Sequence, residues 1–286
     1  MIAYLAITPA RDEEQLMAAH IESMAAQTVL PRRWILIDDG SRDATGRLID
    51  EAARRWSWIE AHHLPAERSR AAGGEAVVTP FLAPERVAEV EAILRLDADL
   101  TFESDFAARL LAELAADSRL GIVGPALWEP YRGGWREVRA SAFHTRGAAK
   151  LYARRCFEAI GGLKPSLGWD TIDEATALML GYRTRCLRRV RAYHHRPQGT
   201  ALGVCRGRIA AGKAAYQAGY SPLFMAARAM RRVFEAPAVA GSLLMLAGFF
   251  EGYLRRRPRA ASAELVRFVR RQQRLRLLLR SSSLWV

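Results

Sequence analysis

The stretch "LRLDADLTFESDF" (94–106) places Asp97 and Asp99 directly after a short apolar run. Charge at the end of a buried strand is unfavourable unless a partner compensates it. Side chains at positions i and i+2 of a strand point to the same face, so the two carboxylates are expected to lie together. Carboxylate oxygens bind Mg²⁺ or Mn²⁺, and the pattern predicts a metal site that also holds a diphosphate. The alternative is an ordinary solvated strand end.

Apolar runs alternate with amphipathic segments around this stretch. Strands are expected at 1–8, 34–37, 92–100 and 120–127, and helices at 12–27, 43–55 and 102–117. This alternation predicts an α/β fold with a mostly parallel sheet covered by helices on both faces. Ligands bind beyond the carboxyl ends of such strands. Thr8, Asp38–Asp39 and Asp97–Asp99 all fall there, which predicts a single site.

The net charge of +13 resides in the last part of the chain. Residues 201–286 contain 16 Lys and Arg against 3 Asp and Glu, whereas residues 1–200 contain 27 of each class. We therefore expect a catalytic domain over 1–204 and a basic helical region over 205–286 that faces an anionic partner. Three scattered cysteines suit a reducing compartment, and the start lacks a secretory pattern, so a cytoplasmic protein is expected.

A second acidic segment, "ILIDDGSRDATGRLID" (35–50), follows the pattern of strand, two aspartates, glycine turn and helix. A carboxylate placed there can accept hydrogen bonds from a nucleotide base or from ribose hydroxyls. The alternative is a plain turn with a helix cap. The first predicted strand is not followed by G-x-G-x-x-G, which argues against a dinucleotide-dependent dehydrogenase.

Three motifs in this order resemble those of the family 2 glycosyltransferases of the Rossmann-like GT-A fold: "ITPARDEE" (7–14), "IDDGSRDAT" (37–45) and "LDADL" (96–100). The resemblance implies a nucleotide-diphosphate sugar as donor. It also implies that Thr8–Pro9 and an aspartate of Asp38–Asp39 contact the base. Asp97 would then meet ribose or metal, and Asp99 the metal.

The segment "RGAAKLYARRCFEAIGGL" (146–163) resembles the acceptor-side segment of the family. The resemblance implies that Gly147 lets the backbone approach the sugar. Between the second and third motifs, many members carry an Ala-Arg-Asn turn. Here that place is taken by a different segment, in which Arg68 and Arg70 are candidates for phosphate contacts. Solvated surface arginines are the alternative.

The segment "GWDTIDEATALMLGYRT" (168–184) stands where the family has its catalytic acidic motif. The usual motif has adjacent Glu and Asp, but Trp169 replaces the Glu. The general base therefore stays open among three residues, which are Asp170, Asp173 and Glu174. For the last two the alternative is a helix N-terminus that favours acidic residues.

The segment "YHHRPQG" (193–199) is placed where the resemblance implies a histidine that completes the metal or phosphate site. His194 and His195 project to opposite faces if the chain is extended, so only one can be the ligand. We expect His195 to be that ligand. Arg196 could instead contact the diphosphate.

The basic region contains 15 uncharged residues at 236–250. A membrane-spanning helix needs about 20 apolar residues, and basic clusters (Arg231–Arg232, Arg255–Arg257) flank both ends. An interfacial or shallow re-entrant hairpin on an anionic membrane is therefore expected. The alternative is a core helix packed on the catalytic domain.

Taken together, these features predict a metal-dependent glycosyltransferase whose base deprotonates an acceptor hydroxyl. The family resemblance implies inversion at the anomeric carbon. The basic region suggests a lipid-linked saccharide as acceptor, in cell-surface or exopolysaccharide assembly, with the protein peripheral at the inner face of the cell membrane. The Q-x-x-R-W motif of polymerising members is absent. Two other classes stay open: an inactive, membrane-associated binding module of the same fold, and a basic nucleic-acid-binding protein.

Overall fold

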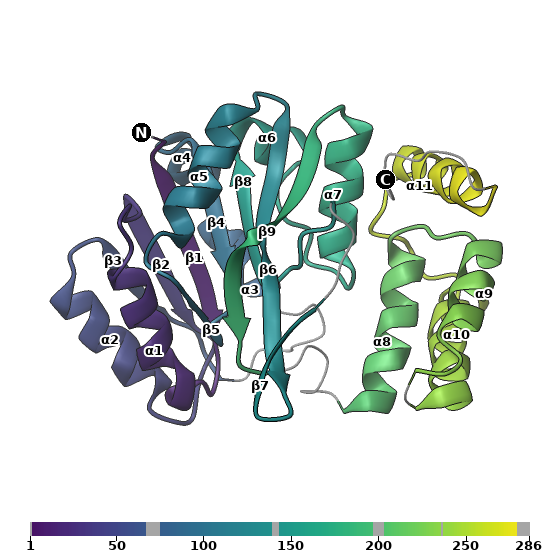
Figure 1. Cartoon of the computed structure of the whole chain (residues 1–286), viewed down its shortest axis with the longest axis horizontal. Helices are drawn as coiled ribbons and strands as arrows, with labels where there is room; N and C mark the ends of the chain where they lie inside the picture. Colours follow the sequence, from purple (N-terminus) through teal and green to yellow (C-terminus); the bar gives the residue numbers. More distant parts are fainter. Residues whose placement is uncertain (1, 67–74, 139–142, 197–202, 236, 279–286) are drawn as a thin grey trace.

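The computed structural model describes residues 2–66, 75–138, 143–196, 203–235 and 237–278. Arg68 and Arg70 lie outside the described residues. Nine strands form one sheet in the order β3-β2-β1-β4-β8-β6-β9-β5, and β7 pairs with β6 (Figure 1). The strands are β1 (Tyr4–Ala10), β2 (Arg33–Asp38), β3 (Ile59–His63), β4 (Ala92–Leu96), β5 (Leu100–Phe102), β6 (Leu120–Tyr131), β7 (Gly134–Glu137), β8 (Ala149–Ala153) and β9 (Arg183–His194).

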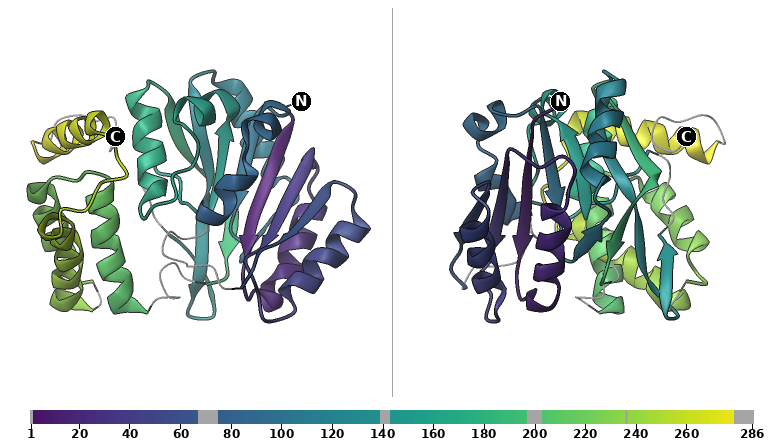
Figure 2. Two further views of the ribbon diagram at one scale, coloured as in Figure 1. Left: turned by 180° about the vertical axis from the view of Figure 1, so that it is seen from behind. Right: turned by 60° about the vertical axis from the view of Figure 1, so that its left-hand side comes forward.

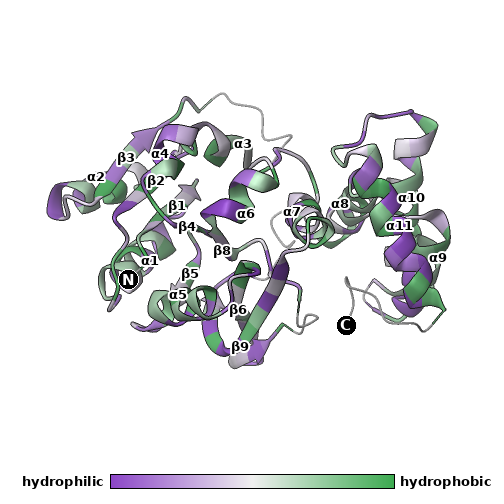
Figure 3. Cartoon of the chain, turned by 90° about the horizontal axis from the view of Figure 1, so that it is seen from above, coloured by the Kyte–Doolittle hydropathy of each residue, from purple (hydrophilic) through white to green (hydrophobic). Residues whose placement is uncertain are grey.

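Helices cover both faces of this sheet. The helices of the α/β part are α1 (Glu14–Ala25), α2 (Thr45–Arg55), α3 (Glu75–Val78), α4 (Pro84–Ala88), α5 (Phe106–Ala116), α6 (Arg154–Ala159) and α7 (Trp169–Met179). Seen from above, α1 and α5 lie on one side of the sheet, and α3, α4 and α6 lie on the other (Figure 3). The predicted α/β class is therefore confirmed.

The sheet is mixed rather than uniformly parallel. β1 lies parallel to β2 and β4, and β2 parallel to β3, as predicted for the first half of the chain. β8 then inserts antiparallel between β4 and β6, and β5 pairs antiparallel with β9. The expected strand over 92–100 is two strands, because a turn at Asp97–Asp99 separates β4 from β5. The two aspartates thus stand on a turn at the edge of the sheet.

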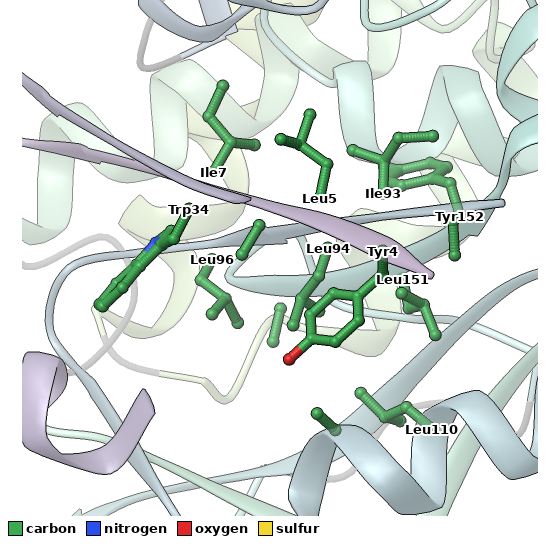
Figure 4. Packing of buried hydrophobic residues seen from close by; sticks show 14 of the residues in the cluster. Tyr4, Leu5, Ile7, Trp34, Ile93, Leu94, Leu96, Leu110, Leu151 and Tyr152 are labelled. Carbon is green, nitrogen blue, oxygen red and sulfur yellow. The ribbon is translucent and has the colours of Figure 1, made fainter. Parts of the chain in front are cut away.

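The central strands are buried on both faces, which explains their nearly continuous apolar sequences. All of β4 and β8 is buried. Side chains of β1, β2, β4, β5, β8 and α5 meet in a single core, part of which Figure 4 shows at close range. The site at the sheet edge therefore rests on a closely packed support.

Four further helices form a separate layer beside α7 (Figures 1 and 2). They are α8 (Val204–Gln217), α9 (Pro222–Arg231), α10 (Ala238–Leu254) and α11 (Ala263–Leu277). They share a second core that includes Met225, Phe249 and Val269 and extends to Ile172 of α7. α7 therefore joins the two cores.

The α8–α10 contact depends on glycine. A Cβ added at Gly212 would overlap the Met245 carbonyl, and one at Gly248 would overlap the Ile209 carbonyl. The backbones can approach this closely only without side chains at these positions. The inner face of α10 thus forms core, while its outer face stays exposed. The helix packs on α8 and α9, whereas the alternative interpretation of 236–250 placed it on the catalytic domain.

Within the described ranges, none of the helices has both the length and the apolar character needed to cross a membrane.

His20 of α1 connects elements that are distant in sequence. Its Nε2 lies 3.3 Å from the Thr8 hydroxyl in β1, and its Nδ1 lies 2.8 Å from the Leu100 carbonyl in β5. The Trp34 indole also donates to the Thr8 hydroxyl, at 3.1 Å. Burial lowers the pKa of His20 to about 4, so this network contains a neutral imidazole at neutral pH.

This buried imidazole predicts a loss of stability in mild acid. The unfolded chain takes up the His20 proton near its ordinary pKa, whereas the folded chain does so only near 4. The contribution of neutral His20 to the free energy of unfolding is therefore complete above about pH 6.5 and declines as the pH falls. Between about pH 7 and pH 5 it decreases by about 2 kcal/mol. Urea unfolding at several pH values should show a shallower pH slope for His20→Gln than for the wild type. Equal slopes would contradict the assignment.

Candidate functional site

The two aspartates at the end of β2 have different environments. Asp38 Oδ1 accepts from the Ser41 amide at 2.8 Å, and its Oδ2 lies 3.1 Å from His63 Nδ1. Asp39 Oδ1 is buried without a hydrogen-bond partner in the part of the chain that the structure describes, and its Oδ2 lies 3.8 Å from Arg11. Asp38 therefore holds the local turn, and Asp39 retains an oxygen that can accept from a ligand.

The Thr8 side chain does not line this edge. It is fully buried, and its hydroxyl is engaged by Trp34 and His20. The next residue, Pro9, is partly exposed. The sequence analysis expected both residues at the donor base, but the side chain of Thr8 belongs to the core.

Asp97, Asp99 and His194 converge where β4 and β9 end. One ligand atom from each lies within 4.8 Å of those from the other two. His194 Nε2 is 3.2 Å from Asp99 Oδ1, and its Nδ1 is 3.6 Å from Glu129 Oε1. Burial alone would lower the pKa of His194, but the Asp99 carboxylate outweighs this and raises it. At 3.6 Å, Glu129 is too far from His194 Nδ1 for a hydrogen bond, and the described residues give this nitrogen no hydrogen-bond partner.

The structure favours His194 over the expected His195. The His195 Nε2 lies 2.8 Å from the Thr101 hydroxyl, and its ring packs edge-on against Trp135, 5.2 Å away. The two imidazoles point to opposite faces, as expected from the alternation of side chains along a strand. Which of them faces Asp97 and Asp99 depends on how β9 pairs with β5. Arg196 also reaches this site, with Nε 3.5 Å from Asp99 Oδ2.

Arg95 is a site residue that the sequence analysis did not identify. It is 4% exposed, and it donates to Asp97 and, at 2.8 Å, to the Gly147 carbonyl. Its guanidinium also lies 5.2 Å from the Trp169 ring centroid. A charged residue inside the buried run "LRLD" was the available signal, because buried charges are normally paired.

Gly147 lies where the chain has no room for a side chain. A Cβ at this position would be 2.9 Å from Trp169 Cζ2 and 3.4 Å from Asp170 Cβ. The glycine thus lets the start of α7 approach the loop that carries it. Asp170 therefore lies beside the loop whose Gly147 carbonyl accepts a hydrogen bond from Arg95.

The other two candidate bases, Asp173 and Glu174, are 4% and 2% exposed. Lys150 Nζ lies 3.0 and 3.1 Å from the two Asp173 oxygens and 3.4 Å from Glu174 Oε1. The Tyr152 hydroxyl donates to Asp173, and the Thr145 amide donates to Glu174 at 2.6 Å. Burial raises the pKa of Asp173; burial acts the same way on Glu174, but Lys150 and His144 lower its pKa overall. Both carboxylates thus serve a buried network.

Asp170 differs from them because it is only partly buried. It stands in the first turn of α7, and its carbonyl accepts from Lys150 Nζ at 2.7 Å. The buried network therefore anchors the helix turn that presents Asp170 beside Gly147. Of the three candidates, Asp170 has the geometry of a group that can meet a ligand.

Residues 5–164, more than half of the chain, match the family described as "Glycosyl transferase family 2". The chain belongs to this family. It is therefore a glycosyltransferase by family, which confirms the resemblance of its three motifs. A search of curated protein sequences finds no match.

Solved structures share the fold of this glycosyltransferase at low identity. The Pyrobaculum calidifontis mannosyltransferase PcManGT, in complex with GDP-Man and Mn²⁺, is 18% identical, with a TM-score of 0.56 over 96% of this chain and 81% of that one. S. aureus TarS 1-349 with UDP-GlcNAc is 15% identical (TM-score 0.57; 89% and 73% covered). GalNAc-T7 with UDP, GalNAc and Mn²⁺ is 14% identical (TM-score 0.58; 89% and 55% covered).

The Lys150 network predicts a large stability effect. Lys150→Met removes the ammonium group between two buried carboxylates, which should lower the free energy of unfolding by about 3–5 kcal/mol. The matched control is Arg47→Met, since Arg47 forms an exposed pair with Glu51 at 2.6 Å. That change should cost less than about 1 kcal/mol. Urea unfolding measures both, and similar values for the two variants would contradict the role given to Lys150.

Proposed function

We propose that this glycosyltransferase moves a sugar from a nucleotide-diphosphate sugar to an acceptor hydroxyl, with inversion at the anomeric carbon. One observation carries the proposal. Three features lie along one edge of the sheet: an Asp39 oxygen with no hydrogen-bond partner among the described residues, a metal-type cluster (Asp97, Asp99, His194), and the partly exposed carboxylate of Asp170.

Asp39 receives the nucleoside part of the donor. Its Oδ1 accepts a hydrogen bond from a base imide or from a ribose hydroxyl, which relieves the cost of a buried, unpartnered oxygen. Solved relatives of the fold hold GDP-Man in one case and UDP-GlcNAc in another, so the fold accommodates more than one base.

The donor set of Asp97, Asp99 and His194 fits Mg²⁺ or Mn²⁺, because two carboxylates and one imidazole face the same point. Bound there, the ion offsets the negative charge of the departing nucleoside diphosphate. Arg95 keeps Asp97 oriented, and Glu129 lies behind His194. PcManGT and GalNAc-T7 were both solved with Mn²⁺.

Asp170 acts as the general base. It takes the proton of the acceptor hydroxyl while that oxygen attacks the anomeric carbon from the face opposite the leaving diphosphate. Gly147 lets the start of α7, which carries Asp170, pack closely on its loop. Asp173 and Glu174 hold α7 in place through Lys150 and do not meet the substrate.

The acceptor is a lipid-linked saccharide, and the protein works at the inner face of the cell membrane, in cell-surface or exopolysaccharide assembly. α9 and α10 belong to the layer that lies away from the sheet (Figure 3). Support comes from an exposed apolar face on these two helices and the turn between them. Its side chains are 41–94% exposed: Leu223, Met230, Phe234, Val239, Leu243, Phe250 and Leu254. Arg255–Arg257 follow directly, as expected for a surface that meets anionic headgroups.

The catalytic proposal is tested with a panel of nucleotide sugars with and without Mn²⁺. Asp99→Asn should lose the metal-dependent thermal stabilisation by nucleotide. Asp170→Asn should retain that stabilisation while turnover falls by about 10²-fold or more, since only the proton acceptor is lost. Glu158→Gln, on the exposed side of α6, serves as the control. Wild-type turnover by Asp170→Asn would contradict its role, and absence of any turnover in the wild type would favour the inactive binding module.

The membrane proposal is tested by cosedimentation with phosphatidylglycerol–phosphatidylcholine vesicles. The double variant Phe234→Ser/Leu254→Ser should bind at least about tenfold more weakly, since each buried apolar side chain contributes about 1.5–3 kcal/mol. The matched control is Leu30→Ser, a leucine 45% exposed outside the C-terminal helices. Unchanged binding by the double variant would contradict this orientation. Binding to duplex DNA in preference to vesicles would favour the nucleic-acid alternative.

A further inference from the structure

His63 stands at the end of β3, beside the turn that carries Asp38 and Asp39. Its Nδ1 lies 3.1 Å from Asp38 Oδ2, and its Nε2 lies 3.0 Å from Asp50 Oδ1 on α2. The pairing of β2 with β3 places His63 directly opposite Asp38. The imidazole therefore bridges two carboxylates from two different elements, and one of them belongs to the turn that presents Asp39.

Two carboxylates on one imidazole require two N–H donors. A neutral imidazole has one N–H and one lone pair, whereas the imidazolium ion donates from both nitrogens. With a neutral ring, one of the two contacts would place a lone pair against a carboxylate oxygen. The geometry of His63 therefore corresponds to the doubly protonated ring, which forms a charge-assisted hydrogen bond on each side.

The charged groups of the described residues that face this ring are Asp38 from β2 and Asp50 from α2. The hydrogen bond to Asp38 raises the pKa of His63, and the bond to Asp50 raises it further, while burial acts in the opposite direction. The side chain is 45% exposed, so its proton exchanges with water. The second proton is therefore lost at a higher pH than in an ordinary histidine.

The segment that follows His63 packs on the same turn. The Leu64 amide donates to the Asp38 carbonyl at 2.8 Å. A Cβ added at Gly40 would lie 2.4 Å from Ala66 Cα, so the two backbones are in direct contact there. The end of β3 thus supports the turn through both its backbone and the His63 ring.

The Asp38 carboxylate passes this support across the turn. Its Oδ1 accepts from the Ser41 amide at 2.8 Å, while its Oδ2 faces His63. A Cβ added at Gly46, in the first turn of α2, would lie 2.8 Å from the same Oδ2, so the carboxylate has little room to move on that side. Asp39 stands between the two residues that this carboxylate connects, Asp38 and Ser41.

We infer that doubly protonated His63 holds the turn at 38–41 in the conformation that presents Asp39, and that loss of its second proton weakens binding of the donor nucleotide. In this role His63 acts through Asp38 and is a positioning residue. That the turn receives a nucleotide rests on the proposed function; that the ring is doubly protonated does not. Because linkage is reciprocal, a bound nucleotide sugar should in turn raise the pKa of His63.

The test is calorimetric titration of the wild type and His63→Gln between about pH 6 and about pH 8.5. The probes are UDP-GlcNAc and GDP-Man in the presence of Mg²⁺. The wild type should bind about fivefold more tightly than His63→Gln at about pH 6, because it has one more charge-assisted hydrogen bond on the turn. The ratio of the two affinities should approach one at the highest pH. Groups that both proteins share, such as His194, affect both affinities and leave this ratio unchanged.

Two further variants separate positioning from a general effect on the fold. Asp50→Asn removes the carboxylate beside Nε2 but keeps the ring, so the pH dependence of binding should move to lower pH. The matched control is His62→Gln, the preceding residue of β3, whose ring packs against Phe81 with centroids 4.7 Å apart. This variant should bind as the wild type does at every pH. Thermal unfolding of each variant verifies that it is folded.

NMR titration of the imidazole signals in the free protein measures the protonation of His63 directly. A pKa at or below that of an ordinary histidine, or a ratio of affinities that does not change with pH, would overturn the inference. Failure of the wild type to bind either nucleotide sugar would overturn the proposed function and the donor role of His63 with it. A raised pKa in the NMR titration would still support the bridge between Asp38 and Asp50 in that case.

Discussion

The ion pairs of Lys150 with Asp173 and Glu174 are the interaction on which the site depends. Lys150 lies in β8, the strand that joins the parallel half of the sheet to β6, and both carboxylates lie on α7. Three buried charges are tolerated only because each is paired and hydrogen-bonded. The result is a helix fixed in position against the sheet, with Asp170 in its first turn and the second core on its other side.

Carboxylates of one chain have divided roles because their surroundings differ. Asp38, Asp173 and Glu174 use their oxygens within the protein, on a turn amide, an imidazole, an ammonium group and hydroxyls. Asp39 has a buried oxygen with no hydrogen-bond partner among the described residues, and Asp170 is partly exposed. Arg95 links the two halves of the site, since it contacts Asp97 and the Gly147 loop together. Arg95 thus connects the two parts of the proposed site.

The C-terminal helices pack against α7 and are part of the same folded unit. Their inner faces pack on one another and on α7, with glycines at the closest crossing, while α9 and α10 present apolar side chains outward. The arginines of this region therefore lie in more than one kind of environment. Some arginines follow the apolar face, and others, such as Arg208 and Arg232, lie near Glu235.

Periodicity and local motifs determined much of this protein from its sequence alone: the alternating strands and helices, the acidic turns after β2 and β4, the family, and the basic C-terminal region. Tertiary structure decided the rest. It brought His194, and not the expected His195, beside Asp97 and Asp99, because the pairing of β9 fixes which face each side chain takes. It placed Thr8 in the core and β8 antiparallel. It distinguished the partly buried Asp170 from the buried Asp173 and Glu174. The last two pair with Lys150, which is about twenty residues away in the chain and meets them only in the folded state. Spacing in sequence reports which side chains can share a face, whereas burial and pairing depend on contacts between distant segments.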